Sequence, residues 1–443
     1  MKLPLLTIAG LAAGAYSCLI PADMRPKAGS GLLHNAPVSF VPRYDIGIGS
    51  GDRFTNGTTP PAGLGIYDRD LKTILNTVEL DSALRGLANV FRDVKLFDAP
   101  FTTFQNASLT GARFGDDPRV FIMSGVHARE RGGPDQVIYF LSDLLHARIS
   151  RSGIRYGNKS YSHKQVLTAL SAGIVIMPLV NPDGVAHDQA TDSCWRKNRN
   201  PASATRGKDV EVGVDLNRNF DFLWDYINAF SPKADLWAVA SDDPTSEVFH
   251  GTAALSEPET QSVAWVLDSF PSLSWLLDVH SVGGTILYGW GDDNTQTSDS
   301  EQNFNNTAYD AKRGITGVDP RDSKYQEYMQ ASDVNAQRNL ANRMKDAMAS
   351  AGDTPYTVQE SVSMYPTSGT STDYALGRYY GRQCGANKVR GLTLEFGEMS
   401  TAAPCPFYPS KKHYHEWMRE VGAGLMELML NAAEEKRVET WEC

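Results

Sequence analysis

The sequence predicts an α/β fold: a mixed, mostly parallel central sheet of about eight strands with helices on both faces, in a single globular domain. Almost continuous apolar runs at 120–123 and 173–180 are typical of strands buried on both sides. Helical patterns alternate with such runs along the chain. With 443 residues, 41% of them hydrophobic, the chain can build one extensive core.

Local patterns place the individual elements. Apolar residues at helical spacing predict a helix over 71–91, and Pro134 opens another because proline is favoured in a first turn. Ser256 and Glu259 match a capping box ahead of a helix that runs through Phe270. The later patterns predict a strand over 275–279, a strand over 389–396 and a closing amphipathic helix over 411–436.

Composition divides the chain into three parts. Residues 1–17 combine Lys2, a short apolar core and small residues before Cys18, which predicts a cleaved signal peptide; an uncleaved anchor is the alternative. Residues 18–64 are rich in Gly, Pro, Asn and Thr, and we expect a short irregular lead-in or pro-segment. Residues 65–443 form the main domain, with a polar insertion at about 291–329 that is a surface excursion or a functional rim.

Further features concern the surroundings of the protein. Asn-x-Ser/Thr triplets predict a secreted, extracellular glycoprotein, and they lie at Asn56, Asn106, Asn158 and Asn305. Among five cysteines, Cys384 and Cys405 bracket one strand and are expected to pair, and Cys443 is expected to be free. A net charge of −10 argues against nucleic acid or membrane partners, and we expect a monomer.

Side chains that can do chemistry follow three of the predicted strands. His127 and Glu130 follow the run at 120–123, His280 follows the strand at 275–279, and Glu395 ends the late strand. Ligands of open α/β sheets bind beyond the carboxyl ends of the strands. Two histidines and one carboxylate are a ligand set of catalytic zinc, so we expect one Zn²⁺ here. Glu395 beside the metal would accept a proton from its water and pass it to a leaving amine.

Two clusters of positive charge extend this pattern. Arg196 could stabilise a developing oxyanion, and the adjacent Asn217 and Arg218 could clamp a free carboxylate. Each feature also has a plain alternative, such as a surface ion pair for His127 and Glu130 or solvated charge for the arginines. Their conjunction at strand ends favours a metal-dependent active site.

Over roughly 68–436 the chain resembles the zinc carboxypeptidases of the carboxypeptidase A type. The resemblance rests on ordered motifs: His-Ala-Arg-Glu at 127–130, Asn-Pro-Asp-Gly at 181–184, Trp-Arg-Lys at 195–197, Val-Asp-Leu-Asn-Arg-Asn-Phe at 214–220, His-Ser at 280–281, Tyr-Pro-Thr-Ser-Gly-Thr-Ser-Thr-Asp at 365–373 and Leu-Thr-Leu-Glu at 392–395. It implies an exopeptidase that hydrolyses the C-terminal peptide bond of peptides and proteins.

The resemblance gives each matching position a role. The zinc ligands match His127, Glu130 and His280; the general base matches Glu395; and the residue that polarises the scissile carbonyl matches Arg196. Asn217 and Arg218 match the pair that binds the terminal carboxylate of the substrate, and Tyr365 matches the tyrosine that closes over it. Arg129 matches a residue that contacts the substrate one step further from the cleaved bond, and Asp215 matches the residue that orients His127.

Specificity depends on the base of the side-chain pocket, where Thr372 matches the residue that separates apolar from basic preference in this family. Thr372 is neither bulky nor acidic, which favours neutral or apolar terminal residues. Glu360 is close enough in sequence to line the pocket and admit a basic group, so that alternative stays open. Two other functions are a carboxypeptidase-like binding protein that has lost catalysis and an amidohydrolase of N-acyl amino acids.

Overall fold

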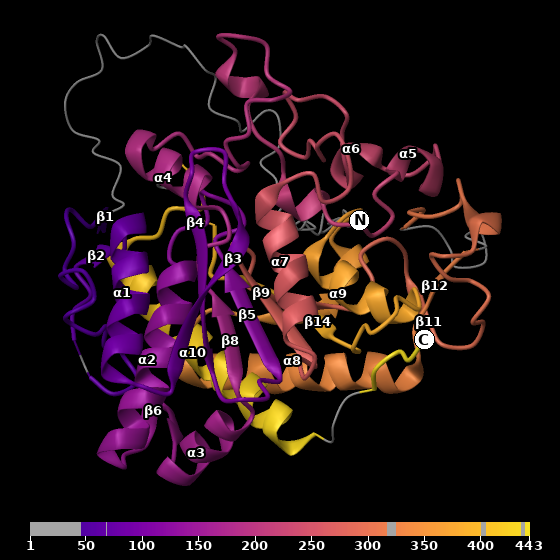
Figure 1. The fold of residues 1–443 in the computed structure, drawn as a ribbon. Coiled ribbons are helices and arrows are strands. Elements are labelled where there is room, and N and C mark those ends of the chain that lie inside the picture. The colour runs from indigo at the N-terminus through magenta and orange to yellow at the C-terminus, as the bar shows by residue number, and fades with distance from the viewer. Residues whose placement is uncertain (1–45, 68, 317–324, 400–404, 436–438) are drawn as a thin grey trace, which may run out of the picture.

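The computed structural model describes residues 46–67, 69–316, 325–399, 405–435 and 439–443. An eight-stranded sheet runs through it in the order β13-β10-β14-β9-β5-β8-β4-β3 (Figure 1). Its strands are β3 (Val94–Thr102), β4 (Ser108–Phe114), β5 (Val120–Ser124), β8 (Ile174–Met177), β9 (Trp275–Ser281), β10 (Thr285–Tyr288), β13 (Thr357–Glu360) and β14 (Arg390–Phe396).

The sheet is mixed, as the sequence predicts. Strands β14, β9, β5 and β8 are parallel neighbours in its centre, and β13 runs parallel to β10. The pairs β10–β14, β4–β8 and β3–β4 are antiparallel. Three short two-stranded sheets lie outside it, formed by β1 (Gly47–Ile48) with β2 (Thr73–Ile74), β6 (Ile154–Tyr156) with β7 (Lys159–Tyr161), and β11 (Thr295–Gln296) with β12 (Glu327–Tyr328).

Helices cover both faces of the sheet (Figure 1). The helices are α1 (Thr77–Val90), α2 (Gly133–Ser150), α3 (His163–Ser171), α4 (Pro182–Thr191), α5 (Tyr226–Ala229), α6 (Leu236–Val239), α7 (Pro258–Ser269), α8 (Ala331–Ala351), α9 (Ser371–Tyr380) and α10 (Lys411–Glu434). Single turns of 3₁₀ helix lie at Asp209–Glu211, Leu216–Arg218, Thr307–Tyr309 and Ser361–Ser363. No helix among the described residues is long and apolar enough to cross a membrane.

Alternation along the strands sorts the core into two layers. In β5, Val120 and Ile122 pack into one cluster with α1, α2, α3, α8 and α10, whereas Phe121 and Met123 pack into a second cluster with α7 and α9. Successive side chains of a strand point to opposite faces, so a continuous apolar run supplies both layers. This explains why the buried runs predicted the central strands correctly.

The predicted capping box at Ser256 is wrong. Helix α7 starts at Pro258, and Glu257 is its N-cap. Proline is accommodated at the first helical position because its missing N–H has no intrahelical partner there, and this fixes the helix start one residue later. The Ser256 hydroxyl instead donates a hydrogen bond to Glu257 Oε1 at 2.7 Å.

The expected cysteine pairing is also wrong. The disulfides join Cys194 to Cys405 and Cys384 to Cys443, with Cα–Cα distances of 5.5 and 5.3 Å. The C-terminal segment returns beside Cys384, where the Lys388 amide donates a hydrogen bond to the Glu439 carbonyl oxygen at 2.9 Å. Nearness along the sequence therefore gave no guide to nearness in space.

The proposed lead-in and insertion are partly described. The signal peptide at 1–17 and the lead-in up to residue 45 lie outside the described residues. The remaining lead-in contributes buried Phe54 and Leu64 to the main core. The insertion is polar yet buries charge: Arg313 is fully buried and lies 2.9 Å from Asp310 Oδ1.

Candidate active site

The loop that follows β5 carries the first two residues of the site. Hydrogen bonds connect this loop to two neighbouring segments: Asn181 Nδ2 donates to the carbonyl oxygen of Val126 (3.0 Å), and the Ala128 amide donates to the carbonyl oxygen of Arg196 (3.1 Å). Asn181 Nδ2 also donates to the carbonyl oxygen of Lys197 (3.2 Å), which joins the two segments to each other. Asn181 begins the turn after the neighbouring strand β8. The segments that follow the carboxyl ends of the parallel strands β5 and β8 are therefore hydrogen-bonded to each other, and together they form a platform for the site.

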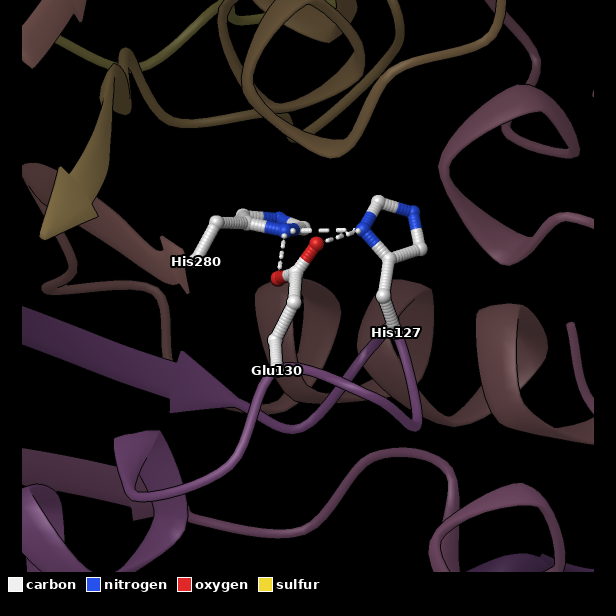
Figure 2. Close-up of side chains that lie close together, drawn as sticks. All are labelled: His127, Glu130 and His280. Atoms are coloured by element: carbon white, nitrogen blue, oxygen red, sulfur yellow. Dashed lines mark hydrogen bonds and ion pairs between the residues drawn. The ribbon is translucent and has the colours of Figure 1, made fainter. Parts of the chain in front are cut away.

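The His127, Glu130 and His280 side chains meet above this platform (Figure 2). The Glu130 carboxylate lies between the two imidazoles, with Oε1 2.8 Å from His127 Nδ1 and Oε2 2.9 Å from His280 Nδ1. The two Nδ1 atoms are 3.1 Å apart. All three side chains are buried.

This triad fits a zinc ion. One ligand atom from each residue lies within 4.8 Å of the others. Tetrahedral zinc with Zn–N bonds of about 2.0–2.1 Å separates two ligand nitrogens by roughly 3.3 Å, close to the separation observed here. Burial alone would raise the pKa of the Glu130 carboxyl, but His127 and His280 together lower it well below its usual range. Glu130 is therefore a carboxylate, the form that binds a cation.

Asp215 supports His127 from the side opposite Glu130. Its Oδ1 lies 3.1 Å from His127 Nε2, while its Oδ2 accepts hydrogen bonds from Arg196 Nε (3.1 Å) and Nη2 (2.9 Å). Burial opposes ionisation of Asp215, but Arg196 and then His127 outweigh it and hold the pKa of that carboxyl far below its ordinary value. A carboxylate on Nε2 fixes the ring orientation and leaves Nδ1 for a metal.

Glu395 lies beside the triad. It stands level with His280 in the parallel pairing of β14 and β9, and it is buried. Neighbouring strands lie about 4.8 Å apart, which places Glu395 next to His280, and Glu395 is not one of the three residues grouped as possible metal ligands. Glu395, His127 and Arg196 line the same cavity.

The cavity also receives most of the predicted substrate residues. Asn217, Arg218, Tyr365 and Thr372 line it together with six residues that sequence reasoning did not find: Leu287, Ser361, Met364, Thr367, Thr370 and Thr393. Thr393 could have been recognised, because it lies two residues before Glu395 on the same face of a strand. Thr367 and Thr370 lie within the motif at 365–373, whereas Leu287, Ser361 and Met364 had no comparable signal.

Arg129 lies apart from this lining. Its guanidinium is fully buried, forms a two-pronged ion pair with Glu247 at 2.9 and 3.2 Å, and stacks over the Phe407 ring at 4.4 Å. A contact between Arg129 and substrate therefore stays a prediction.

Glu360 also lies apart, on the opposite side of the sheet. In the parallel register of β13 and β10, Glu360 pairs with Tyr288, and Gln359 pairs with Leu287, which lines the cavity. Paired residues share a face and successive residues alternate, so Glu360 is directed away from the pocket. Burial raises the pKa of its carboxyl, and the Thr295 amide donates a hydrogen bond to it at 3.3 Å.

The fold and this geometry agree with comparisons to known proteins. The family model described as zinc carboxypeptidase matches residues 101–400, which is more than half of the chain. The chain belongs to the zinc carboxypeptidase family. This family uses one zinc ion, and His127, Glu130 and His280 are the one group of histidine, cysteine and acidic side chains in the described residues that could hold a metal ion.

Similar proteins include proteins named carboxypeptidase B and carboxypeptidase A4. Carboxypeptidase B of Helicoverpa zea is 29% identical over 212 residues, 47% of this chain and 42% of that protein. Carboxypeptidase B of Astacus astacus is 26% identical over 245 residues, 54% of this chain and 71% of that protein. Carboxypeptidase A4 of Mus musculus is 25% identical over 307 residues, 67% and 57% of the two chains. The match thus spans less than half the length of the first of these relatives.

Solved structures show the same fold. Thrombin-activatable fibrinolysis inhibitor aligns with a TM-score of 0.59 at 18% identity, covering 82% of this chain and 75% of that one. Carboxypeptidase A from Helicoverpa armigera aligns with a TM-score of 0.57 at 22% identity, covering 82% and 74%.

Proposed function

We propose that this protein is a secreted zinc metallocarboxypeptidase that removes single, neutral or apolar residues from the C-termini of peptides and proteins. One observation carries the proposal: a metal triad, a buried carboxylate and an Asn–Arg pair meet at one cavity. A zinc ion held by His127, Glu130 and His280 would supply Lewis-acid chemistry, acidifying water and polarising a carbonyl.

The chain's own groups would then carry the protons and the charge. Glu395 would accept a proton from the attacking water and return it to the leaving amine as the bond breaks. Arg196 would donate hydrogen bonds to the carbonyl oxygen as negative charge develops there. Asp215 keeps the Arg196 guanidinium in place, so little reorganisation is needed when that charge appears.

The Asn217–Arg218 pair would restrict cleavage to chain ends. Asn217 Oδ1 accepts a hydrogen bond from the Ser371 amide at 2.9 Å, which leaves the Asn217 NH₂ group to donate. Arg218 donates to the carbonyl oxygens of Asn217 (2.7 Å) and Ala238 (3.1 Å), while its Nε has no hydrogen-bond partner among the described residues. The pair can therefore still bind a terminal carboxylate. Tyr365 would close over the bound residue.

The pocket lining supports a neutral preference. Besides the catalytic and clamp residues, its side chains are the hydroxyls of Ser361, Thr367, Thr370, Thr372 and Thr393 with the apolar Leu287 and Met364. None of these is an acid that could pair with a basic residue, and Glu360 is directed elsewhere.

Secretion, processing and glycosylation complete the proposal. We propose a signal peptide at 1–17, a short irregular lead-in or pro-segment over 18–64 and a catalytic domain over 65–443. Two disulfides support an oxidising compartment, and the four sequon asparagines are exposed. N-terminal sequencing and glycan analysis of the protein secreted from eukaryotic cells test these points.

The decisive experiment is digestion of a peptide mixture that differs only in the C-terminal residue, with and without a zinc chelator. We expect stepwise loss of neutral and apolar residues that the chelator abolishes. Equal cleavage after Phe and Arg would contradict the pocket assignment, and internal cuts would contradict exopeptidase action.

A further inference from the structure

Asp278 is a buried carboxylate that the mechanism above does not use. It lies in the middle of β9, between β5 and β14, and it is fully buried. Placing a carboxylate inside a sheet is costly unless it is paired and hydrogen-bonded. Its partners are therefore informative.

One partner is the metal ligand two residues later. Asp278 Oδ2 lies 2.9 Å from His280 Nε2. Residues i and i+2 of a strand point to the same face, so this proximity follows from the sequence spacing. His280 Nε2 is buried and has no hydrogen-bond partner among the described residues, so this oxygen is the polar contact that it makes. Asp278 is thus the acceptor that His280 has within reach.

The second partner is Ser371, the first residue of α9. Its hydroxyl donates a hydrogen bond to Asp278 Oδ2 at 2.6 Å, and its amide donates to Asn217 Oδ1 at 2.9 Å. Ser371 also precedes Thr372, which lines the pocket. One serine therefore joins the carboxylate beneath His280 to a residue of the substrate clamp.

Asp278 has no lysine or arginine partner in the described part of the chain, whereas Asp215 is paired with Arg196. In the described residues, His280 is therefore the basic side chain that Asp278 contacts. A carboxylate on the outer nitrogen of a ligand histidine fixes the ring and raises its basicity as a ligand.

We propose that Asp278 is a positioning residue for zinc: it orients His280 so that Nδ1 faces the ion. Ser371 holds Asp278 and Asn217 in one network, so the metal site and the carboxylate clamp are positioned together. The proposal rests on the zinc site of the proposed function, but it concerns metal affinity and needs no particular substrate.

The test compares Asp278→Asn, Asp278→Ala and Ser371→Ala with the wild-type protein. Asp143→Asn is the matched control, because Asp143 is an equally buried carboxylate on α2 that accepts hydrogen bonds from the Gly65 amide (2.8 Å) and the Tyr156 hydroxyl (2.9 Å), away from the site. Zinc affinity is measured by competition with a chromophoric chelator, and ligand geometry by the visible spectrum of the cobalt-substituted protein.

We expect Asp278→Asn to weaken zinc binding about 10- to 100-fold and to alter the cobalt spectrum, with a larger loss for Asp278→Ala. Ser371→Ala should weaken zinc binding several-fold and raise KM more than it lowers kcat. Asp143→Asn should leave zinc affinity and the cobalt spectrum unchanged.

Wild-type zinc affinity and an unchanged spectrum in Asp278→Asn would overturn the proposal. If the Asp278 variants do not fold, unchanged zinc affinity in Ser371→Ala would overturn it instead. A protein whose zinc affinity depends on Asp278 but that cleaves no peptide would uphold this inference and refute the proposed function, so the two failures are distinguishable.

Discussion

The two histidines of the metal site are supported in contrasting ways. His127 depends on Asp215, which is 88 residues away in sequence, paired with Arg196 and hydrogen-bonded by the Asn217 amide. His280 depends on Asp278, two residues earlier in the same strand, which has a serine hydroxyl as its other partner. The first support is assembled from loops, and the second is built into the sheet.

The comparison shows two ways in which a metal-binding histidine can be held in position. A strand in the centre of a sheet fixes its side chains through its neighbours, so a local pair needs little further support. Loops need additional ties, and the His127 side has them: the Asn181 hydrogen bonds, the Arg196 ion pair and the Cys194–Cys405 disulfide. Changes on the His127 side should therefore affect both stability and metal binding, whereas changes on the His280 side should mainly affect metal binding.

The largest expected effect is on catalysis, and it comes from Glu395, which supports neither histidine in the way that Asp215 and Asp278 do. Glu395→Gln removes the proposed proton acceptor while keeping the shape of the side chain, so kcat for peptide hydrolysis should fall by about 10²–10⁴-fold. Zinc affinity should remain at the wild-type level because the three side chains of the metal triad are unchanged. Parallel measurement of peptide turnover and chelator competition checks this. Wild-type turnover would show that Glu395 is not the base.

The disulfides test the claim that the loops on the His127 side need a covalent cross-link. Replacing Cys194 and Cys405 by alanine should lower the free energy of unfolding by about 2–5 kcal/mol, since a link across 211 residues restricts the unfolded chain strongly. It should also raise KM, because Cys194 adjoins the segment that carries Arg196. The matched variant replaces Cys384 and Cys443, whose disulfide spans only 59 residues. Its loss should lower the free energy of unfolding by less. Denaturant unfolding measures the loss of stability in each variant. Equal losses would contradict the claim that the Cys194–Cys405 disulfide is the more important of the two.

Asp215→Asn and Asp278→Asn compare the supports directly. Both should weaken zinc binding by about 10- to 100-fold. Only Asp215→Asn should also reduce stability by about 3–5 kcal/mol, because it removes the buried carboxylate that forms an ion pair with the buried Arg196. Chelator competition and chemical denaturation of the same samples separate the two effects. A stability loss of equal size in both variants would refute the contrast.

The smallest effect concerns Lys197, next to Arg196. Burial lowers the pKa of its ammonium to about 8 from its ordinary value near 10.5. The folded state thus binds fewer protons than the unfolded state between these values, so this group makes the protein more stable as pH rises from about 8 to 10.5. Lys197→Met should remove that gain. Unfolding free energies of the wild type and Lys197→Met at pH 7, 8.5 and 10 test it, and a pH-independent difference would contradict the assignment.

Local sequence patterns predicted the central strands because burial on both faces leaves continuous apolar runs. The fold class followed from these strands, and His127, Glu130, His280 and Glu395 could be grouped because each lies at a strand end. The Asp278–His280 spacing was equally readable, since it is a strand periodicity, but it was overlooked.

Other features depend on long-range packing and left no local signal. Cys194 pairs with Cys405 because the loop after α4 meets the segment before α10. The direction of Glu360 depends on the register between β13 and β10, and no pattern within either short strand determines it. The pocket loops around Met364 and Thr367 are irregular, so their side chains could be placed only in the folded chain.

The most direct test of the central claim uses one peptide in two forms, with a free C-terminal carboxylate and with a C-terminal amide, both ending in a neutral residue. The zinc-loaded protein should shorten the free acid one residue at a time, as followed by mass spectrometry, and should leave the amide intact because Asn217 and Arg218 have no carboxylate to bind. Cleavage of both forms at equal rates, or of neither, would contradict the account.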